Sequence, residues 1–356
     1  MLELNKEKQT NYKRKIFYQY KNYDELDINE VSSRLLDQCE IIGGRKFLNN
    51  HEANYLMPSD EMELRRLEIA HVLKRFSWKG NFSAPVEEIL KKGKATVLDA
   101  GCGAGCWVLD LGQDYPNSTF VGIDIQSKGF PSVNERSPNT GFLVHNLLSG
   151  IPFPDETFDY VHMESMWLAF TKQQYMNVIH ELVRVTKYNG WIEIYEVNFD
   201  LKNLGSSMKS VQDACKFIYV NISVGQLKYY GSNWNLFIQI TILDVKVHAK
   251  LKENGFDPML FLEISKCLKS INELTNIEYK KVNVSLGGWA GRYGEYTLGA
   301  IKQFYEAATY MPDYMRISQS DYQKLIDEFD KQCTQNHTSL DIYRLIAKKV
   351  NLSETQ

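Results

Sequence analysis

The chain has 356 residues, of which 44% are hydrophobic and 24% charged, the balance of an ordinary globular protein with a sizeable core. Its formal net charge of -3 gives no strong positive field, so neither nucleic acid nor an anionic membrane is expected as a partner. The six cysteines are scattered, which favours reduced thiols in a cytoplasmic protein over a disulfide framework or a metal site. A basic triplet, Lys13-Arg14-Lys15, leaves a nuclear address open, although such triplets are more often solvated surface.

The N-terminal part of the chain changes character near residue 50. Residues 1–50 are polar and weakly periodic, and we interpret them as a loosely attached arm. Asp60 and Glu63 have the spacing of a capping box, which predicts a helix that begins there and ends near Trp78. This helix belongs to a predicted helical region at 51–95 that leads into the core.

The middle of the chain, residues 96–197, has the pattern of a parallel sheet. Short apolar runs alternate with longer helical stretches, as in strands that helices bury on both faces. A helix is predicted at Lys172–Val185, and Lys187–Gly190 is interpreted as the turn after it. Five strands are predicted here: Thr96–Asp99, Thr119–Asp124, Gly141–Val144, Phe158–His162 and Trp191–Tyr195.

The last part of the chain is predicted to complete this sheet after an insertion. Residues 198–275 are expected to be mostly helical and to cover a substrate. The expected fold is α/β, a seven-stranded sheet with helices on both faces. Residues 276–356 supply a sixth and a seventh strand and two helices between them: Ile277–Val284 and Asp341–Ala347, and Tyr293–Ala308 and Ser320–Cys333.

A glycine-rich turn follows the first predicted strand. Asp99 ends that strand, and Gly101, Gly103 and Gly105 alternate before the next helix. Glycine adopts backbone conformations denied to other residues and lets a ligand approach the main chain. Dinucleotide enzymes use a similar loop to hold a pyrophosphate, and a plain strand-to-helix turn is a further interpretation. The plain turn leaves the acidic strand ends unexplained.

Polar residues also stand at the ends of the second and third strands. Asp124 ends the second strand, where a carboxylate can accept hydrogen bonds from both hydroxyls of a ribose, and Asn146 follows the third. Each residue has an ordinary alternative, since Asp124 suits a helix cap and Asn146 suits a turn. Together with the glycine loop, however, they favour a bound ligand.

The order of these motifs resembles that of class I S-adenosylmethionine-dependent methyltransferases. The Gly-x-Gly-x-Gly spacing, with Asp99 two residues ahead, resembles their first motif, and residues 151–161 and 183–191 resemble the segments before their strands four and five. The resemblance implies their Rossmann-like sheet, S-adenosylmethionine as the cofactor and Asn146 at its adenine amine. The resemblance rests on the whole ordered set of motifs, because a single glycine loop is a weak signal.

A second resemblance lies outside the core. The pattern from Tyr55 to His71 resembles the first helix of the fungal LaeA-like methyltransferases, relatives of a regulator of secondary metabolism. Residues 190–196 and 284–289 are similar to the fifth strand and the glycine–tryptophan passage of that group. Ser285-Leu286 and Ala290–Tyr293 depart from the group's pattern near the expected acceptor side, so the substrate is not carried over.

These resemblances imply cofactor-binding residues on the first helix, the glycine loop and the strand ends. A guanidinium can make a forked bond to a carboxylate, so Arg66 is assigned to the methionine carboxylate, although an ion pair with Glu63 or Glu68 is an alternative. Tyr55 and Trp107 are expected either to line the cofactor or simply to pack. The predicted set is Tyr55, Arg66, Asp99, Ala100, Gly101, Cys102, Gly103, Gly105, Asp124, Ile125, Asn146, Leu147, Met163 and Glu164.

The expected chemistry is methyl transfer to an acceptor held in line behind an activated carbon, with no metal. His162 is the predicted base if the acceptor needs one, and Glu196 is predicted to orient the acceptor or the cofactor. The alternatives are a hydrogen-bonded core histidine at 162 and a paired structural carboxylate at Glu193. His71 is interpreted as structural.

The partner that the sequence favours is a small organic methyl acceptor. The predicted cover is rich in aromatic residues that could enclose a flat or apolar molecule, although they could equally form the cover's own core. A cofactor-binding regulator that acts through protein partners is the alternative, and a dinucleotide oxidoreductase is more distant. The sequence predicts no oligomeric state. The aromatic residues are Tyr229, Tyr230, Trp234, Phe237 and Trp289.

Overall fold

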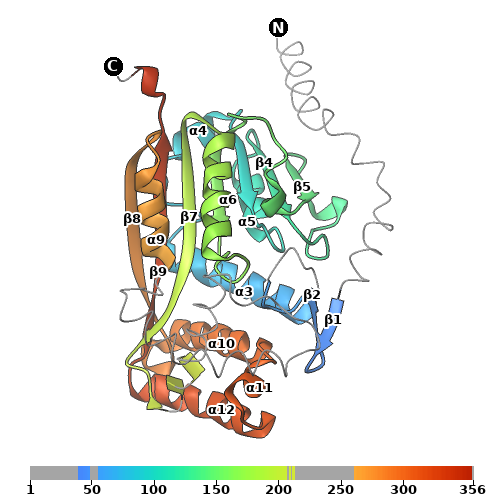
Figure 1. Cartoon of the computed structure of the whole chain (residues 1–356), viewed down its shortest axis with the longest axis vertical. Coiled ribbons are helices and arrows are strands. Elements are labelled where there is room, and N and C mark those ends of the chain that lie inside the picture. The colour runs from blue at the N-terminus through green and yellow to red at the C-terminus, as the bar shows by residue number, and fades with distance from the viewer. Residues whose placement is uncertain (1–38, 49–54, 207, 210, 213–259, 355–356) are drawn as a thin grey trace. The chain divides into compact units, whose positions relative to one another are not determined.

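The computed structural model describes residues 39–48, 55–206, 208–209, 211–212 and 260–354 (Figure 1). By its internal packing, Glu40–Gln356 forms one compact unit, separate from Met1–Cys39. The larger unit contains the sheet, the helices that cover it and the site described below. The predicted aromatic residues of the cover, except Trp289, lie outside the described residues.

A seven-stranded sheet forms the centre of the described chain, in the order β5-β4-β3-β6-β7-β9-β8. Every neighbouring pair from β5 to β7 is parallel, and β9 runs antiparallel to both β7 and β8. The order reverses between β3 and β6, and in open sheets ligands bind beyond the carboxyl ends of strands at such a switch point. The strands are β3 (Thr96–Ala100), β4 (Thr119–Asp124), β5 (Thr140–Val144), β6 (Phe158–Glu164), β7 (Thr186–Lys202), β8 (Leu274–Ser285) and β9 (Ser339–Lys349).

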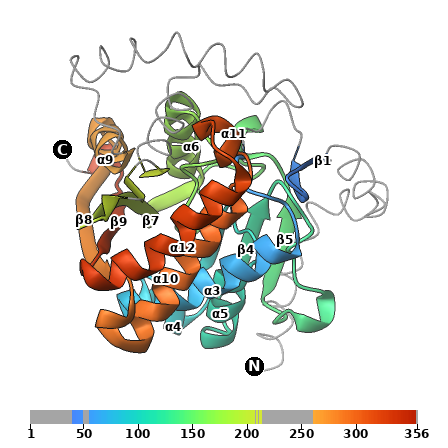
Figure 2. The ribbon, with the colours of Figure 1, turned by 90° about the horizontal axis from the view of Figure 1, so that it is seen from below.

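Helices cover both faces of the sheet. In Figure 1, α6 and α9 lie in front of β7 and β8, with α4 and α5 behind, whereas α3, α10, α11 and α12 gather at the lower end, onto which Figure 2 looks. Short 3₁₀ turns occupy Val133–Glu135, Leu147–Ser149, Gly288–Ala290 and Leu352–Glu354. The helices are α3 (Glu61–Trp78), α4 (Glu87–Lys92), α5 (Cys106–Asp114), α6 (Lys172–Val185), α9 (Leu260–Ser270), α10 (Gly291–Ala307), α11 (Met311–Met315) and α12 (Gln319–Gln335).

The helix ends follow the capping chemistry of the sequence. Asp60 caps α3 by accepting a hydrogen bond from the Glu63 backbone N–H at 3.0 Å, and the helix ends at Trp78, as predicted. Thr171 and Gln174 form a reciprocal capping box at the start of α6. The predicted apolar positions of α6 are buried, which fixes this helix against the sheet: Tyr175, Val178, Ile179, Leu182 and Val183.

The fifth strand is longer than its apolar run predicts. Thr186 pairs with Phe158 and Trp191 with Tyr160, so the predicted turn at 187–190 is an irregularity inside β7, where Asn189 has a φ of +64°. At its other end β7 continues to Lys202, so the prediction of helix from residue 198 is wrong there. Those residues pair with β9, more than a hundred positions later, which no local pattern shows.

The end of the predicted arm is folded. β1 (Cys39–Ile42) and β2 (Arg45–Leu48) form a hairpin, and Gly43 and Gly44 adopt positive φ in its turn. Phe47 is 1% exposed and its ring meets that of Tyr310 edge to face at 6.2 Å between centroids. The interpretation of 1–50 as a loose arm is therefore wrong for these residues, and residues 1–38 lie outside the described chain.

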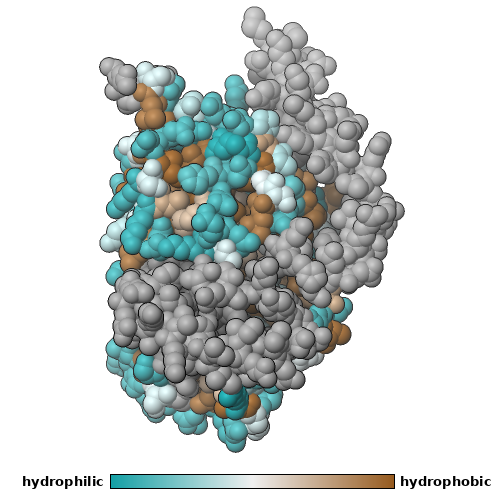
Figure 3. Space-filling model, in the orientation of Figure 1, coloured by the Kyte–Doolittle hydropathy of each residue, from teal (hydrophilic) through white to brown (hydrophobic). Residues whose placement is uncertain are grey.

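The surface of the described chain is mostly polar on the face that Figure 3 shows, with hydrophilic side chains spread over the region of α6 and β7. Across the described residues, every helix is too short or too polar to cross a bilayer.

Candidate functional site

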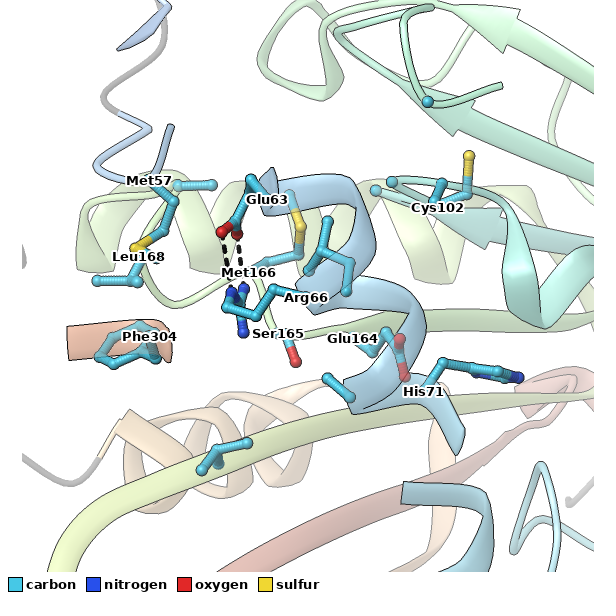
Figure 4. Close-up of a pocket in the computed structure, with 18 of the residues that line it drawn as sticks. Met57, Glu63, Arg66, His71, Cys102, Glu164, Ser165, Met166, Leu168 and Phe304 are labelled. Atoms are coloured by element: carbon cyan, nitrogen blue, oxygen red, sulfur yellow. Dashed lines mark hydrogen bonds and ion pairs between the residues drawn. The ribbon is translucent and has the colours of Figure 1, made fainter. Parts of the chain in front are cut away.

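A cavity of about 260 Å³ opens beyond the carboxyl ends of the parallel strands. Its floor is formed by the glycine loop after β3 and by the ends of β4, β6 and β7, and α3 and α10 enclose it (Figure 4). The cavity therefore lies at the switch point of the sheet, where the topology predicts a ligand.

The glycine loop presents its backbone to this cavity. Gly101, Gly103 and Gly105 all have positive φ, and the N–H groups of Gly101 and Cys102 both donate to the Ile123 carbonyl, at 2.8 and 2.9 Å. A Cβ atom added to Gly101 would overlap the sulfur of Met166, which packs against the loop. A side chain at Gly101 would therefore be strained by the positive φ and would also displace Met166.

Asp124 lies beside the glycine loop, and each of its carboxylate oxygens accepts a hydrogen bond from a backbone N–H group. Oδ2 accepts from the Gly103 N–H at 2.9 Å and Oδ1 from the Gln126 N–H at 3.0 Å. Burial raises the pKa of Asp124, although these two hydrogen bonds act against the rise. A carboxylate has about four acceptor positions, so each oxygen retains capacity for one hydroxyl of a vicinal diol.

Asn146 lines the same end of the cavity. Its Oδ1 accepts from the Leu148 N–H at 3.0 Å and caps a short 3₁₀ turn, so the ordinary alternative for this residue is present. Its amide Nδ2 remains a donor and Oδ1 has a second acceptor position. Ile125 and Leu147 supply apolar surface next to it. The hydrogen-bonding groups of Asp124 and Asn146 at this end of the cavity suit a ribose and an adenine ring.

His162 does not reach the cavity, which corrects its prediction as a base. It is 1% exposed, its Nδ1 lies 2.8 Å from Asp99 Oδ1, and its ring stacks on Trp107 at 4.1 Å. The pairing of Asp99 with His162 across β3 and β6 directs both side chains beneath the glycine loop. Burial raises the pKa of Asp99, and the histidine acts against that rise. This pair is the hydrogen-bonded core histidine of the alternative interpretation.

Glu196, which was predicted to orient the acceptor or the cofactor, is also absent from the cavity lining, so it is not placed to contact either of them directly. Its Oε1 accepts from the Met166 N–H at 2.9 Å and from the Tyr175 hydroxyl at 2.7 Å. Its Oε2 has no partner among the described residues, and burial raises its pKa to about 8. Glu196 thus holds the turn through Ser165, whose φ of +56° is strained for a residue with a side chain.

Arg66 lines the cavity but pairs with Glu63, as the alternative interpretation proposed. Its Nε and Nη2 donate to the two carboxylate oxygens at 2.9 and 2.6 Å, drawn as dashed lines in Figure 4. The forked geometry that would suit the methionine carboxylate is therefore already used. The Glu193 carboxylate is likewise a paired structural group, since it accepts from the Ser83 and Ala84 N–H groups and lies 3.2 Å from Arg344.

A charged pair that the sequence analysis missed lies between α3 and the end of β6. The Lys74 ammonium binds the Glu164 carboxylate, and Lys74 also lies 5.1 Å from the centre of the Tyr195 ring. Burial raises the pKa of Glu164, but the charge of Lys74, its hydrogen bond to the carboxylate and the nearby side chains of His162 and His71 together outweigh burial, so the pKa falls to about 2. Glu164 is ionised at neutral pH, so it is a poor proton acceptor.

The cavity-lining residues of α3 that the sequence analysis did not assign to the site share one face of the helix. Their helical spacing is a signal that the sequence did contain. Their spacing of three and four places them on the cavity side, including His71, which was interpreted as structural and whose Nε2 lies 2.9 Å from Asp110 Oδ2. The residues of this face that line the cavity are Glu63, Arg66, Leu67, Ala70, His71, Lys74 and Ser77.

Most of the predicted cofactor residues meet at this cavity. Asp99, Ala100, Gly105 and Met163 are the predicted residues that do not line it, because they lie within the strands or at the start of α5. Trp107 also lines it, whereas Trp289 stacks on His337. The predicted residues in the lining are Tyr55, Arg66, Gly101, Cys102, Gly103, Asp124, Ile125, Asn146, Leu147 and Glu164.

Comparison with known proteins agrees with this geometry. Residues 97–190 match a family described as a methyltransferase domain, and this span holds the glycine loop, Asp124 and Asn146. The chain therefore contains a class I S-adenosylmethionine-dependent methyltransferase domain, and S-adenosylmethionine is the cofactor of that domain.

The relatives of the chain are distant. It is 26% identical over 151 residues to the N-methyltransferase verN of Clonostachys rogersoniana, which covers 42% of this chain and 52% of that protein. It is 29% identical over 163 residues to the secondary metabolism regulator laeA of Coprinopsis cinerea, covering 44% and 39% respectively. The chain thus spans about half, or less, of the length of these relatives.

A solved structure shows a looser likeness. The phosphoethanolamine N-methyltransferase 2 of Haemonchus contortus, in complex with S-adenosyl-L-methionine, aligns with a TM-score of 0.42 at 16% identity, over 86% of this chain and 62% of that one.

Proposed function

We propose that this protein transfers a methyl group from S-adenosylmethionine to a small organic acceptor. The observation that carries the proposal is the cavity itself, because the glycine loop and Asp124 lie at one end of it and the other end extends under α10. One cavity thus joins a surface suited to a cofactor to a second surface that an acceptor could contact. The names of the distant N-methyltransferases support a small acceptor.

The residues at the cofactor end have separable roles in this proposal. The positive-φ glycines bring the main chain against the ligand, the Asp124 carboxylate accepts from the ribose hydroxyls, and Asn146 binds the adenine edge. The bound cofactor supplies a methyl carbon on a sulfonium; the C–S bond breaks as the bond to the acceptor atom forms, and an acceptor proton leaves to solvent. The described part of the chain therefore works by binding and alignment.

The regions around this core keep the roles that the sequence suggested, as proposals. We assign residues 51–95 to the entry helices that lead into the core, residues 203–275 to an acceptor cover, and 276–356 to completion of the sheet. The corrected boundary of the insertion follows Lys202, where β7 ends.

Transfer of label tests the proposal. The full chain is incubated with S-adenosylmethionine labelled in its methyl group and with a metabolite extract, and small products are separated from the cofactor. We expect a labelled small molecule whose amount grows with enzyme concentration. If the protein binds the cofactor but label stays on it with every extract, the proposed turnover is wrong.

A regulator that binds the cofactor without turnover is the second candidate, favoured by the relatives named as secondary metabolism regulators. Affinity capture with the full chain, with and without residues 1–38, distinguishes the two. A specific protein partner combined with no labelled product would favour the regulator.

A further inference from the structure

The end of the cavity beyond β6 differs in character from the cofactor end. β7, β9 and β8 contribute side chains from the edge of the sheet that the cavity meets, and α10 closes over them. Because β9 is antiparallel, its first residues lie beside the carboxyl ends of β7 and β8. The wall includes Thr297, whose hydroxyl donates to the Ser285 carbonyl at 2.6 Å. The rest of the wall is apolar: Trp167, Leu168, Val197, Val284, Leu286, Ala300, Ile301, Phe304, Leu340 and Ile342.

We call the part of the cavity that these wall residues enclose the apolar chamber. Two ion pairs lie at its border with the cofactor end. Arg66 binds Glu63, and Lys74 binds Glu164, so each cation has a carboxylate partner. Figure 4 shows Phe304 and Leu168 gathered on one side of Arg66 and Cys102 of the glycine loop on the other. Within the described chain, the charges at the border are therefore paired with one another, which leaves no free counter-charge for a ligand.

The aromatic faces at the border are also engaged. The Arg66 guanidinium lies 5.8 Å from the centre of the Phe304 ring, and the Lys74 ammonium lies 5.1 Å from that of Tyr195. A protein cation thus already occupies one face of each ring, a position from which the ring would attract a ligand cation. A charged group that entered the chamber would lose its hydration, and the described residues of the chamber wall offer it no compensating charge.

We propose that the apolar chamber is the acceptor site, and that it takes an uncharged and largely apolar molecule that points its nucleophilic atom at the border beside Glu164. This inference rests on the proposed function and narrows its substrate class. It disfavours amino acid zwitterions, phosphorylated amines and quaternary ammonium compounds as acceptors. Ala300 and Phe304 of α10 line the chamber, so we expect the size of their side chains to affect the size of the acceptor.

A pair of fluorescent probes tests the charge preference. N-phenyl-1-naphthylamine is neutral, and 8-anilino-1-naphthalenesulfonate has the same ring system with one negative charge. Each is titrated into the full chain with saturating S-adenosylhomocysteine. We expect the neutral probe to bind about tenfold more tightly or better, a difference of about 1.4 kcal/mol. Equal or tighter binding of the sulfonate would overturn the inference.

Variants on α10 locate the probe. Ala300→Phe fills the chamber and should weaken the neutral probe about tenfold, whereas Gln303→Phe adds the same side chain at an exposed position of the same helix and should not. Ala300→Leu, a smaller change, serves if the first variant does not fold. An unchanged affinity in both Ala300 variants places the probe elsewhere and contradicts the chamber.

Calorimetry separates this inference from the proposed function. The affinity for S-adenosylhomocysteine should be the same in the Ala300 variants and the parent chain, because the chamber lies outside the cofactor end. If the parent chain does not bind S-adenosylhomocysteine, the proposed function itself is wrong. If it binds S-adenosylhomocysteine normally but the Ala300 variants leave the affinity for the neutral probe unchanged, only this inference is wrong.

Discussion

Asp124 is the side chain on which cofactor binding most depends. Its two oxygens are fixed by backbone N–H groups from both sides, so it is aligned before the ligand arrives. An uncharged amide at this position loses the charge-assisted hydrogen bonds to the ribose and turns one acceptor into a donor, while the shape of the side chain is kept.

We therefore expect Asp124→Asn to weaken S-adenosylhomocysteine binding by about 1.5–3 kcal/mol, roughly tenfold to a hundredfold, by isothermal titration calorimetry. Asp330→Asn, at an exposed position of α12, is the matched control and should bind as the parent does. An Asp124→Asn affinity within twofold of the parent would remove this residue from the site.

Glu196 gives the protein a pH dependence. Burial raises its pKa to about 8 from 4.5, so the folded state retains a proton that the unfolded chain has released. The stabilisation from this proton is complete below about pH 4.5 and is lost as the pH rises towards 8. Glu196→Gln cannot ionise, and it retains an oxygen that can accept from Tyr175 and Met166.

We compare the free energy of unfolding of the parent with that of Glu196→Gln at each pH. The difference, parent minus variant, should fall by on the order of 1–3 kcal/mol between pH 5 and pH 8.5. Urea unfolding at both pH values measures it. Glu306→Gln, exposed on α10, should show no such change. Parallel pH profiles for the parent and Glu196→Gln would show that the carboxyl is already ionised at neutral pH.

Single residues were predictable where a motif fixes the backbone. Gly101, Gly103 and Asp124 follow from their positions after β3 and β4, because strand ends in a parallel sheet converge on one edge. The directions of His162 and Glu196 were not predictable, since they depend on which face of a strand each side chain occupies and on what packs there. That information comes from register, which a single sequence does not display.

At the scale of elements, the β1–β2 hairpin is the clearest addition to the predicted fold. Residues 1–50 are polar as a whole, so the composition of this N-terminal segment suggests a solvated arm. The structure nevertheless packs Phe47 into the same hydrophobic cluster as Met57, Tyr310 and Met311. The hairpin therefore helps to hold the segment that leads into α3.

Phe47→Ala should lower the free energy of unfolding by about 3–5 kcal/mol, because it leaves a cavity in this cluster. Ile41→Ala in the same hairpin removes a side chain that is 69% exposed and should change stability by about 0.5 kcal/mol or less. Chemical denaturation of both variants makes the comparison. If the two variants lose equal stability, the hairpin does not belong to the core.

Elements with their own periodicity were predicted well, and elements defined by distant pairing were not. The ends of α3 and α6 match prediction because capping residues and apolar spacing encode them locally. The extension of β7 to Lys202 depends on β9 as a partner, and the bulge near Asn189 depends on β6. Both features arise from tertiary contacts that override local preference.

For the whole molecule, the predicted seven-stranded sheet and the motifs at its strand ends were sufficient to locate the cofactor end of the site. The reversal of strand order at β3 and β6 brings together loops that are far apart in sequence, and α3 and α10 then enclose them. The acceptor chamber was not predictable, because its wall combines β7, β8, β9 and α10 and each strand contributes only a few residues. Its apolar character became visible only with the fold.

The central claim is that the cavity beside the glycine loop binds the cofactor, and calorimetric titration of the full chain with S-adenosylhomocysteine tests it most directly. We expect heat that saturates at one ligand per chain, and none with NAD under the same conditions. A folded chain that gives no heat with S-adenosylhomocysteine or S-adenosylmethionine would contradict the claim.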